Sequence, residues 1–261
     1  MNHHPRRRFG QNFLIDKNIL NNIIRVVALQ QNEPIIEIGP GTGALTESLL
    51  TQNAVVYAVE IDRDLCVLLR EKYKSQPNFH LFEADALKFD YETLIRQTGA
   101  AKIVGNIPYN ITSPLLFKIF ELGSRVSLVT FLVQREIALR ICALPNTKEY
   151  GILTVLSNFY GKAQIAFHVS PQVFRPRPQV WSSLLTFKPL PNEFNSDFRS
   201  AFHLLVKKAF NQRRKTLKNA LSELLQADIT DSPVDLQRRA ESLSCAEFIA
   251  LTHFLLPHIK T

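Results

Sequence analysis

The apolar residues in the first two-thirds of the chain follow two different spacings. In one early segment they recur every three or four positions, which predicts an amphipathic helix carrying Ile19, Leu20, Ile23, Ile24 and Val27. Asp16 precedes this segment and can cap the helix. Short apolar runs typical of buried strands occupy residues 35–38, 54–61, 79–82, 102–105 and 126–133. Helical patterns lie between several of them, at residues 44–50, 65–73 and 113–122, and this alternation predicts βαβ units with a mostly parallel sheet.

The pattern changes in the last third of the chain. Residues 164–169 and 180–187 resemble further strands, and a proline-rich loop around Phe174 separates them. Residues 188–192 are typical of a linker, and residues from 197 onward show only helical patterns. We therefore expect a doubly wound α/β domain over residues 1–188 and a small helical domain over residues 189–261.

A glycine-rich loop, Gly39-Pro40-Gly41-Thr42-Gly43, joins the first strand run to a helix. Glycines there let the backbone turn sharply and approach a ligand closely. Two acids follow at later strand ends. Glu60 could accept both hydroxyls of a ribose, and Asp85 could accept the amino group of an adenine. The spacing from the loop to Glu60 also fits NAD, but the additional acidic strand end favours a nucleoside with a short charged tail, such as S-adenosylmethionine.

A tetrapeptide, Asn106-Ile107-Pro108-Tyr109, follows the fourth strand run. It resembles the N-x-P-Y motif of methyltransferases that act on the amino groups of adenine or cytosine. An aromatic amino nitrogen is a poor nucleophile because its lone pair is delocalised into the ring. The Asn106 side-chain oxygen and the Ile107 carbonyl could accept its two hydrogens and direct the lone pair outward. Pro108 fixes the backbone, and Tyr109 offers a face for an extruded base.

Taken alone, the tetrapeptide fits adenine or cytosine, in DNA or RNA. Four motifs together resemble the KsgA-type ribosomal RNA adenine dimethyltransferases over nearly the whole chain: Arg8-Phe9-Gly10-Gln11-Asn12-Phe13-Leu14, Glu37-Ile38-Gly39-Pro40-Gly41-Thr42-Gly43, Asn106-Ile107-Pro108-Tyr109 and Asn211-Gln212-Arg213-Arg214-Lys215-Thr216-Leu217. The resemblance implies a Rossmann-like class I S-adenosylmethionine methyltransferase fold, α/β, with a small C-terminal all-helical domain that contributes to rRNA binding.

The activity that the resemblance implies is dimethylation of two adjacent adenosines in the 3′-terminal hairpin loop of small-subunit (16S) rRNA. The substrate would be an immature 30S particle, and the protein would take part in small-subunit biogenesis. The resemblance also implies roles for individual residues. Asn12 and Leu14 would contact the methionine part of the cofactor, Gly39 would be the glycine of the cofactor loop, Glu60 would bind the ribose and Asp85 the adenine. Asn106 would contact both the cofactor and the target base. Phe174 would cover the other face of the target base, although it could equally be a core aromatic.

The chain departs from the family pattern beside Phe174. Arg177-Pro178-Gln179-Val180 stands where the family has a proline-proline-lysine-valine run, and Trp181 stands where a small acidic residue is usual. These positions lie on the target-base side, so the departure bears on RNA contacts more than on cofactor contacts.

The net charge of +8 suits a polyanionic partner, most often a nucleic acid. Residues 5–8 form a cationic start, and residues 207–218 contain no acid and six cations: Lys207, Lys208, Arg213, Arg214, Lys215 and Lys218. In a helix, Arg214 and Lys218 would share a face. The alternative is a solvated helix face, but the family resemblance favours RNA, recognised by its shape and by a splayed loop base.

Other classes of protein fit less well. Cys66, Cys142 and Cys245 form no C-x-x-C pair, and no H-E-x-x-H occurs, so we expect no bound metal. No apolar run approaches the roughly 20 residues needed to cross a membrane, and we expect a cytoplasmic monomer. Two alternatives stay open, namely a resistance-type methyltransferase of large-subunit rRNA and a non-catalytic ribosome-assembly factor.

Overall fold

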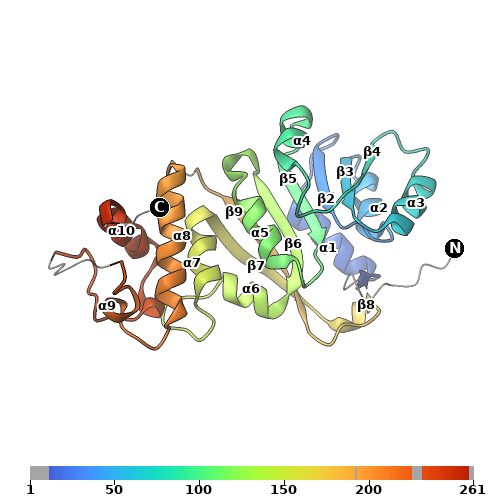
Figure 1. The fold of residues 1–261 in the computed structure, drawn as a ribbon. Coiled ribbons are helices and arrows are strands. Elements are labelled where there is room, and N and C mark those ends of the chain that lie inside the picture. The colour runs from blue at the N-terminus through green and yellow to red at the C-terminus, as the bar shows by residue number, and fades with distance from the viewer. Residues whose placement is uncertain (1–11, 192, 225–230, 259–261) are drawn as a thin grey trace. The chain divides into compact units, whose positions relative to one another are not determined.

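The computed structural model of the chain describes residues 12–191, 193–224 and 231–258 (Figure 1). The predicted cationic start, residues 5–8, lies outside the described residues, and so do residues 8–11 of the first motif. By its contacts the chain divides into two compact units. The first unit holds the described residues up to Ala138 together with Lys162–Leu190, and the second holds Leu139–Gly161 together with those from Pro191 onward.

The first unit is built on a seven-stranded sheet in the order β4-β3-β2-β5-β6-β9-β7 (Figure 1). The strands are β2 (Pro34–Ile38), β3 (Val55–Glu60), β4 (Phe79–Glu83), β5 (Lys102–Asn106), β6 (Leu128–Gln134), β7 (Gly161–Val169) and β9 (Ser182–Pro189). The strands β2 to β6 pair with one another in parallel, and β9 pairs with β6 in the antiparallel direction. A separate two-stranded sheet pairs β1 (Phe13–Leu14) with β8 (Phe174–Arg175). The predicted α/β class with a mostly parallel sheet is confirmed.

The strand order reverses between β2 and β5. From β2 the chain moves outward through β3 and β4, then returns to the other side of β2 to form β5 and β6. In an open parallel sheet, such a switch point leaves a crevice beyond the carboxyl ends of the two strands. The glycine loop follows β2 and the tetrapeptide begins at the end of β5, so the topology brings these two motifs together.

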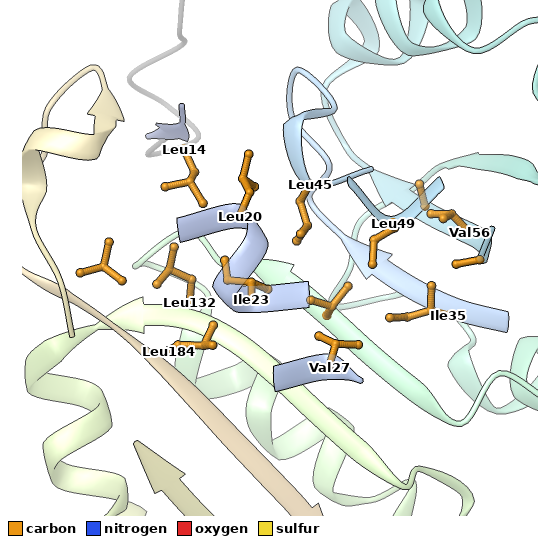
Figure 2. Packing of buried hydrophobic residues seen from close by; sticks show 14 of the residues in the cluster. Leu14, Leu20, Ile23, Val27, Ile35, Leu45, Leu49, Val56, Leu132 and Leu184 are labelled. Carbon is orange, nitrogen blue, oxygen red and sulfur yellow. The ribbon is translucent and has the colours of Figure 1, made fainter. Parts of the chain in front are cut away.

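The helix α1 (Lys17–Val27) precedes the first strand of the sheet. The parallel strands are connected by α2 (Ala44–Thr51), α3 (Arg63–Lys72), α4 (Tyr91–Thr98) and α5 (Thr112–Phe120), the last followed by a 3-10 turn at Gly123–Arg125. The predicted cap of α1 is confirmed, because Oδ1 of Asp16 accepts the backbone N–H groups of Asn18 and Ile19. The apolar stripe of α1 enters the core. Figure 2 shows Leu20, Ile23 and Val27 among the side chains of the sheet and of α2.

The second unit is helical: α7 (Ile152–Tyr160), α8 (Ser196–Asn211), α9 (Leu217–Ala220), α10 (Cys245–Leu255) and 3-10 turns at Ala240–Ser242 and Leu256–His258. A row of stacked aromatic rings joins its parts, with Phe159 4.1 Å from Phe202 and 5.3 Å from Phe194 between ring centroids. Ser244 and Glu247 form a capping box at the start of α10. The helix α6 (Arg135–Ile141) lies across the boundary of the two units in sequence.

The division of the chain differs from the expected one in one respect. Residues 139–161 are expected in the first domain, whereas they cluster with the C-terminal helices. The reason is a set of contacts with that region, such as the bond from the Tyr150 hydroxyl to the Leu243 carbonyl at 2.6 Å. No helix in the described part of the chain is long and apolar enough to cross a membrane.

Candidate active site

A cavity of about 320 Å³ opens at the switch point of the sheet, a volume typical of small-molecule sites. Eight of the nine predicted site residues line it: Asn12, Leu14, Gly39, Glu60, Asp85, Asn106, Pro108 and Tyr109. They come from the ends of β2, β3, β4 and β5, with Asn12 and Leu14 added from the segment before α1. The structure therefore gathers residues that are far apart in sequence around one space.

Phe174 is the predicted site residue that the structure does not bring to this cavity. Its side chain is 1% exposed and belongs to the same apolar cluster as Leu14, Leu132 and Leu184. The pairing of β8 with β1 sets Phe174 opposite Leu14. Phe174 therefore takes the second of the two positions considered for it, that of a core aromatic. Because its ring is packed within this cluster, it has no face open to a base.

The glycine loop after β2 is held by side chains from two other elements. Gly39 has a φ of +68°, a left-handed conformation that glycine adopts without strain. The backbone N–H of Gly41 donates to Oε2 of Glu60 at 3.1 Å, and the Tyr73 hydroxyl donates to the Gly43 carbonyl at 2.7 Å. Lys72, which pairs with Glu47, also reaches the loop by a 3.5 Å contact with the Thr42 carbonyl. The loop is therefore fixed at several points along its length.

Glu60 is a buried carboxylate with three backbone donors. Its Oε2 accepts from Gly41, and its Oε1 accepts from Ile61 at 2.9 Å and from Asp62 at 3.0 Å. Burial raises the pKa of Glu60, and these donors oppose that rise. A carboxylate has about four acceptor sites. A ribose that used both hydroxyls on Glu60 would therefore displace one donor, and the Gly41 bond is the longest of the three.

A second buried acid, Glu37, lies at the end of β2. Its Oε2 accepts from the Thr46 hydroxyl at 2.6 Å, which links β2 to the first turns of α2. Burial raises the pKa of Glu37 to about 7, against the lowering effect of the Thr46 bond. The carboxyl group also lines the cavity. Glu37 belongs to one of the four sequence motifs, but no role is predicted for it from sequence.

Asp85 follows β4 and begins the turn that leads to α4. Its Oδ1 accepts from the Leu87 backbone N–H at 2.9 Å, which fixes the orientation of the carboxylate. Among the described residues, none donates to its other oxygen. Asp85 therefore has one oxygen available to a ligand in the cavity that it lines.

The amide of Asn106 is oriented by the segment before α1. Its Nδ2 donates to the Asn12 carbonyl at 2.7 Å. The orientation leaves Oδ1 as an acceptor, and no donor to it occurs in the part of the chain that the structure describes. The backbone N–H of Ile107 donates to Leu132 at 3.0 Å, while the Ile107 carbonyl accepts from no described group. Two acceptor oxygens are thus open at the start of the tetrapeptide.

Gly105 is a further site residue, which the sequence analysis does not identify. A Cβ atom there would lie 2.4 Å from the Ile38 carbonyl oxygen and 2.8 Å from Cδ1 of Ile107. No real side chain makes such a contact with the backbone, so β2 and β5 can approach this closely only with glycine at this position. A glycine inside a strand run was the available signal, because it often marks a close backbone approach.

Tyr109 is half-buried at the end of the tetrapeptide. Its hydroxyl lies 3.2 Å from that of Ser182, the first residue of β9. Burial raises the pKa of Tyr109 despite this hydrogen bond, so the phenol is protonated at neutral pH. The ring is therefore neutral and is held at its hydroxyl end.

The cationic stretch in the second unit does not form one helix. The helix α8 ends at Asn211, a turn follows, and α9 begins only at Leu217, so Arg214 and Lys218 do not share a helical face as expected. The cause is Arg213, which pairs with Glu241 and donates to the carbonyls of Thr147 and Lys148. Lys208 pairs with Glu223. The other four cations have no ion pair among the described residues: Lys207, Arg214, Lys215 and Lys218.

Comparisons with known proteins place the chain in one family. The family model described as ribosomal RNA adenine dimethylase matches residues 2–256. Two relatives carry the name ribosomal RNA small subunit methyltransferase A. The one from Aromatoleum aromaticum is 43% identical over 97% of this chain and 95% of its own length. The one from Hahella chejuensis is 39% identical over 98% of this chain and 94% of its own.

Two solved structures share the fold. A dimethyladenosine transferase from Plasmodium falciparum has a TM-score of 0.77 at 23% identity, covering 92% of this chain and 95% of that one. The 23S rRNA methyltransferase ErmE has a TM-score of 0.68 at 24% identity, covering 94% and 99%. At these identities the two likenesses establish the fold alone, an α/β domain with a C-terminal helical region.

Proposed function

Because the chain belongs to the ribosomal RNA adenine dimethylase family, we propose that it methylates adenine amino groups of small-subunit rRNA with S-adenosylmethionine. The targets are two adjacent adenosines in the 3′-terminal hairpin loop of 16S rRNA, each converted to dimethyladenosine. The observation that carries the proposal is Asn106, which lines the cavity with the glycine loop: its amide nitrogen is held by Asn12, while its side-chain oxygen accepts from none of the described residues.

The residues around the cavity fit S-adenosylmethionine. Two carboxylates, Glu60 and Asp85, line it at the ends of neighbouring strands, where a ribose and an adenine amino group could donate to them. Ile61, which is 48% exposed, adds an apolar surface suited to a flat ring. Asn12 and Leu14 would contact the methionine part. When bound, the cofactor supplies a methyl group on a positively charged sulfur, which is open to attack by a nucleophile.

The tetrapeptide prepares the nucleophile. The side-chain oxygen of Asn106 and the backbone carbonyl oxygen of Ile107 accept hydrogen bonds from the two N–H groups of the adenine amino group. These two hydrogen bonds draw the nitrogen toward tetrahedral geometry. Pro108 has no N–H and restricts the backbone that carries these acceptors. The neutral ring of Tyr109 stacks on the extruded base, since its hydroxyl is fixed by Ser182. Positioning and preorganised dipoles carry the step without a strong general base, because the amino proton leaves only after the methyl group has been transferred.

The RNA partner is an immature 30S particle, on which the enzyme works as a cytoplasmic monomer and contributes to subunit biogenesis. The first unit is the catalytic domain, and the helical unit contributes to rRNA binding. The unpaired cations of the second unit support this role, because exposed lysines and arginines attract phosphates without regard to sequence. Four of them come from residues 207–218 and have no ion pair among the described residues, namely Lys207, Arg214, Lys215 and Lys218.

A labelled-methyl assay on purified, undermethylated ribosomal subunits tests the proposal. We expect label in small subunits and, after nucleoside analysis, dimethyladenosine as the product. Label that appeared only in large subunits would contradict the choice of substrate. An Asn106→Ala variant that lost methylation but still bound subunits and supported assembly would make the binding role primary.

A further inference from the structure

Trp181, the one tryptophan of the chain, lies exposed in the loop before β9. The exposed fraction of its side chain is 49%, and that of Val180 beside it is 43%. Burying a large aromatic side chain is among the more favourable contributions to folding. An indole left half in water is therefore available to a ligand, and its place in the fold indicates which one.

Trp181 lies at the edge of the sheet that carries the cavity. The next residue, Ser182, pairs with Gln134, the last residue of β6, and the backbone N–H of Arg135 donates to the Trp181 carbonyl at 2.9 Å. The strand β6 is parallel to β5 and ends on the same side as the strands that line the cavity. Trp181 therefore lies beyond the carboxyl ends of the parallel strands, as the tetrapeptide does.

The backbone also connects Trp181 to the proposed base-stacking residue. The Ser182 hydroxyl is 3.2 Å from the Tyr109 hydroxyl, and Ser182 itself is buried. Successive side chains of an extended strand point to opposite faces. Ser182 thus faces inward to Tyr109, while Trp181 faces the solvent one residue away.

The charge around Trp181 is positive. Residues 170–192 contain no acid, and Arg175 and Arg177 precede the tryptophan in the same loop. Arg135, at the start of α6, is exposed as both of these are, and Glu136 is the acid next to it. No ion pair engages Arg135 or Arg177 within the described ranges, so their charge remains available to phosphate groups.

We propose that Trp181 stacks on a nucleobase that flanks the target adenine in a single-stranded RNA loop, with Arg135 and Arg177 attracting the neighbouring phosphates. The proposal rests on the proposed function, because it takes Tyr109 as the side chain that meets the target base. Exposed aromatic rings combined with cations are the general means by which proteins hold single strands.

Tryptophan fluorescence tests the stacking directly, because no other indole contributes to the signal. The full-length protein is titrated with a short single-stranded oligoribonucleotide and, separately, with an abasic chain of the same length at the same salt concentration. We expect quenching by the base-bearing strand and none by the abasic strand. Equal quenching by both, or quenching by neither, overturns the proposal.

Methyl-transfer kinetics on undermethylated small subunits give a second test. Trp181→Ala should raise the KM for subunits by about 5- to 100-fold, the range that loss of one stacked base produces, while the KM for S-adenosylmethionine stays unchanged. Trp181→Phe should retain most of the affinity, and the control Val180→Ala should match the wild type. A wild-type KM in Trp181→Ala, or equal losses in the Ala and Phe variants, overturns the proposal.

The two proposals can fail separately. If the wild-type protein transferred no label to small subunits, the proposed function would fail, yet the fluorescence titration would still decide whether Trp181 binds bases. If small subunits were labelled and the Trp181 variants behaved like the wild type, only the stacking assignment would fail. Thermal unfolding of each variant separates a loss of affinity from a loss of the fold.

Discussion

The two loops that meet at the switch point of the sheet differ in how their polar groups are satisfied. The glycine loop after β2 is bonded at several points by residues outside it, including Glu60 and Tyr73. The tetrapeptide after β5 is tied at the Asn106 nitrogen and the Ile107 N–H, yet none of the residues that the structure describes donates to its Asn106 side-chain oxygen or its Ile107 carbonyl.

The contrast indicates that the two loops are preorganised in different ways, the first in its shape and the second in the acceptors that it presents. Buried polar groups are normally paired, so a loop whose bonds are already made has its shape before a ligand arrives. Acceptors left open at fixed positions instead bind a donor that approaches them, without a rearrangement at the moment of reaction. We infer that cofactor affinity depends on what supports the first loop, and that the chemical step depends on what the second loop leaves free.

The largest expected effect comes from removing an open acceptor of the tetrapeptide. Asn106→Ala deletes the side-chain oxygen and the bond to Asn12, so kcat for methyl transfer should fall by about 100- to 1000-fold, the usual cost of one preorganised hydrogen-bonding group. The measurement is single-turnover transfer of labelled methyl to small subunits. Asn18→Ala, on the exposed side of α1, is the control. A wild-type rate in Asn106→Ala would show that the chemical step does not depend on this acceptor.

The support under the glycine loop should be sensitive to pH through Glu37. Because its pKa is raised from 4.5 to about 7 in the folded state, the folded protein binds the proton more tightly, and stability should decrease as the pH rises through this interval. Glu37→Gln keeps an acceptor for Thr46 but cannot ionise. Between pH 5 and pH 8 the wild type should lose about 2–3 kcal/mol of unfolding free energy relative to this variant.

Urea unfolding of both proteins at the two pH values measures this difference. The other titratable groups are present in both proteins, so their contributions cancel. A constant difference between the wild type and Glu37→Gln across the range would show that Glu37 has an ordinary pKa. The first loop would then have no ionisable support at β2.

Removing the acid shared by loop and cofactor should weaken binding without abolishing it. Glu60→Ala deletes the carboxylate that accepts from Gly41 and that we assign to the ribose, so the Kd for S-adenosylmethionine should rise by about 10- to 100-fold. Isothermal calorimetry gives the value. The matched control is Glu83→Ala, at the exposed end of β4, and unchanged binding in Glu60→Ala would refute the ribose assignment.

The smallest effect should come from Tyr73, which supports the loop without lining the cavity. Tyr73→Phe removes one neutral hydrogen bond to the Gly43 carbonyl, so the Kd for the cofactor should rise by about 3- to 10-fold while kcat at saturation is unchanged. Tyr57→Phe, on β3, is the control. A fall in kcat with an unchanged Kd would mean that the first loop takes part in the chemical step, against the comparison.

Much of the first unit is predictable from sequence because its signals are local. The period of the apolar residues and the Asp16 cap define α1, and continuous apolar runs define the parallel strands. The residues that line the cavity follow from the same logic, since strand ends of a parallel sheet meet at one edge. The roles assigned to them stay predictions.

The features that escaped prediction depend on distant partners. Gly105 is required by the backbone of Ile38, and the turn after Asn211 is fixed by Arg213 reaching Glu241. The helix α7 is buried nearly all round, and its polar residues Thr154 and Ser157 are buried with the apolar ones, so its spacing does not show which face would meet solvent. Phe174 shows the same limit, because an aromatic after a proline-rich loop can face either a ligand or the core.

The interleaving of the two units has a consequence for the order in which the protein is made. The chain passes between units three times, after residues 138, 161 and 190. Residues 139–161 leave the ribosome before residue 191 onward, yet their partners, such as the Leu243 carbonyl that accepts from Tyr150, are in the later segment. Domains generally fold as they emerge. The first unit can therefore complete its sheet before residues 139–161 have met their partners in the last part of the polypeptide.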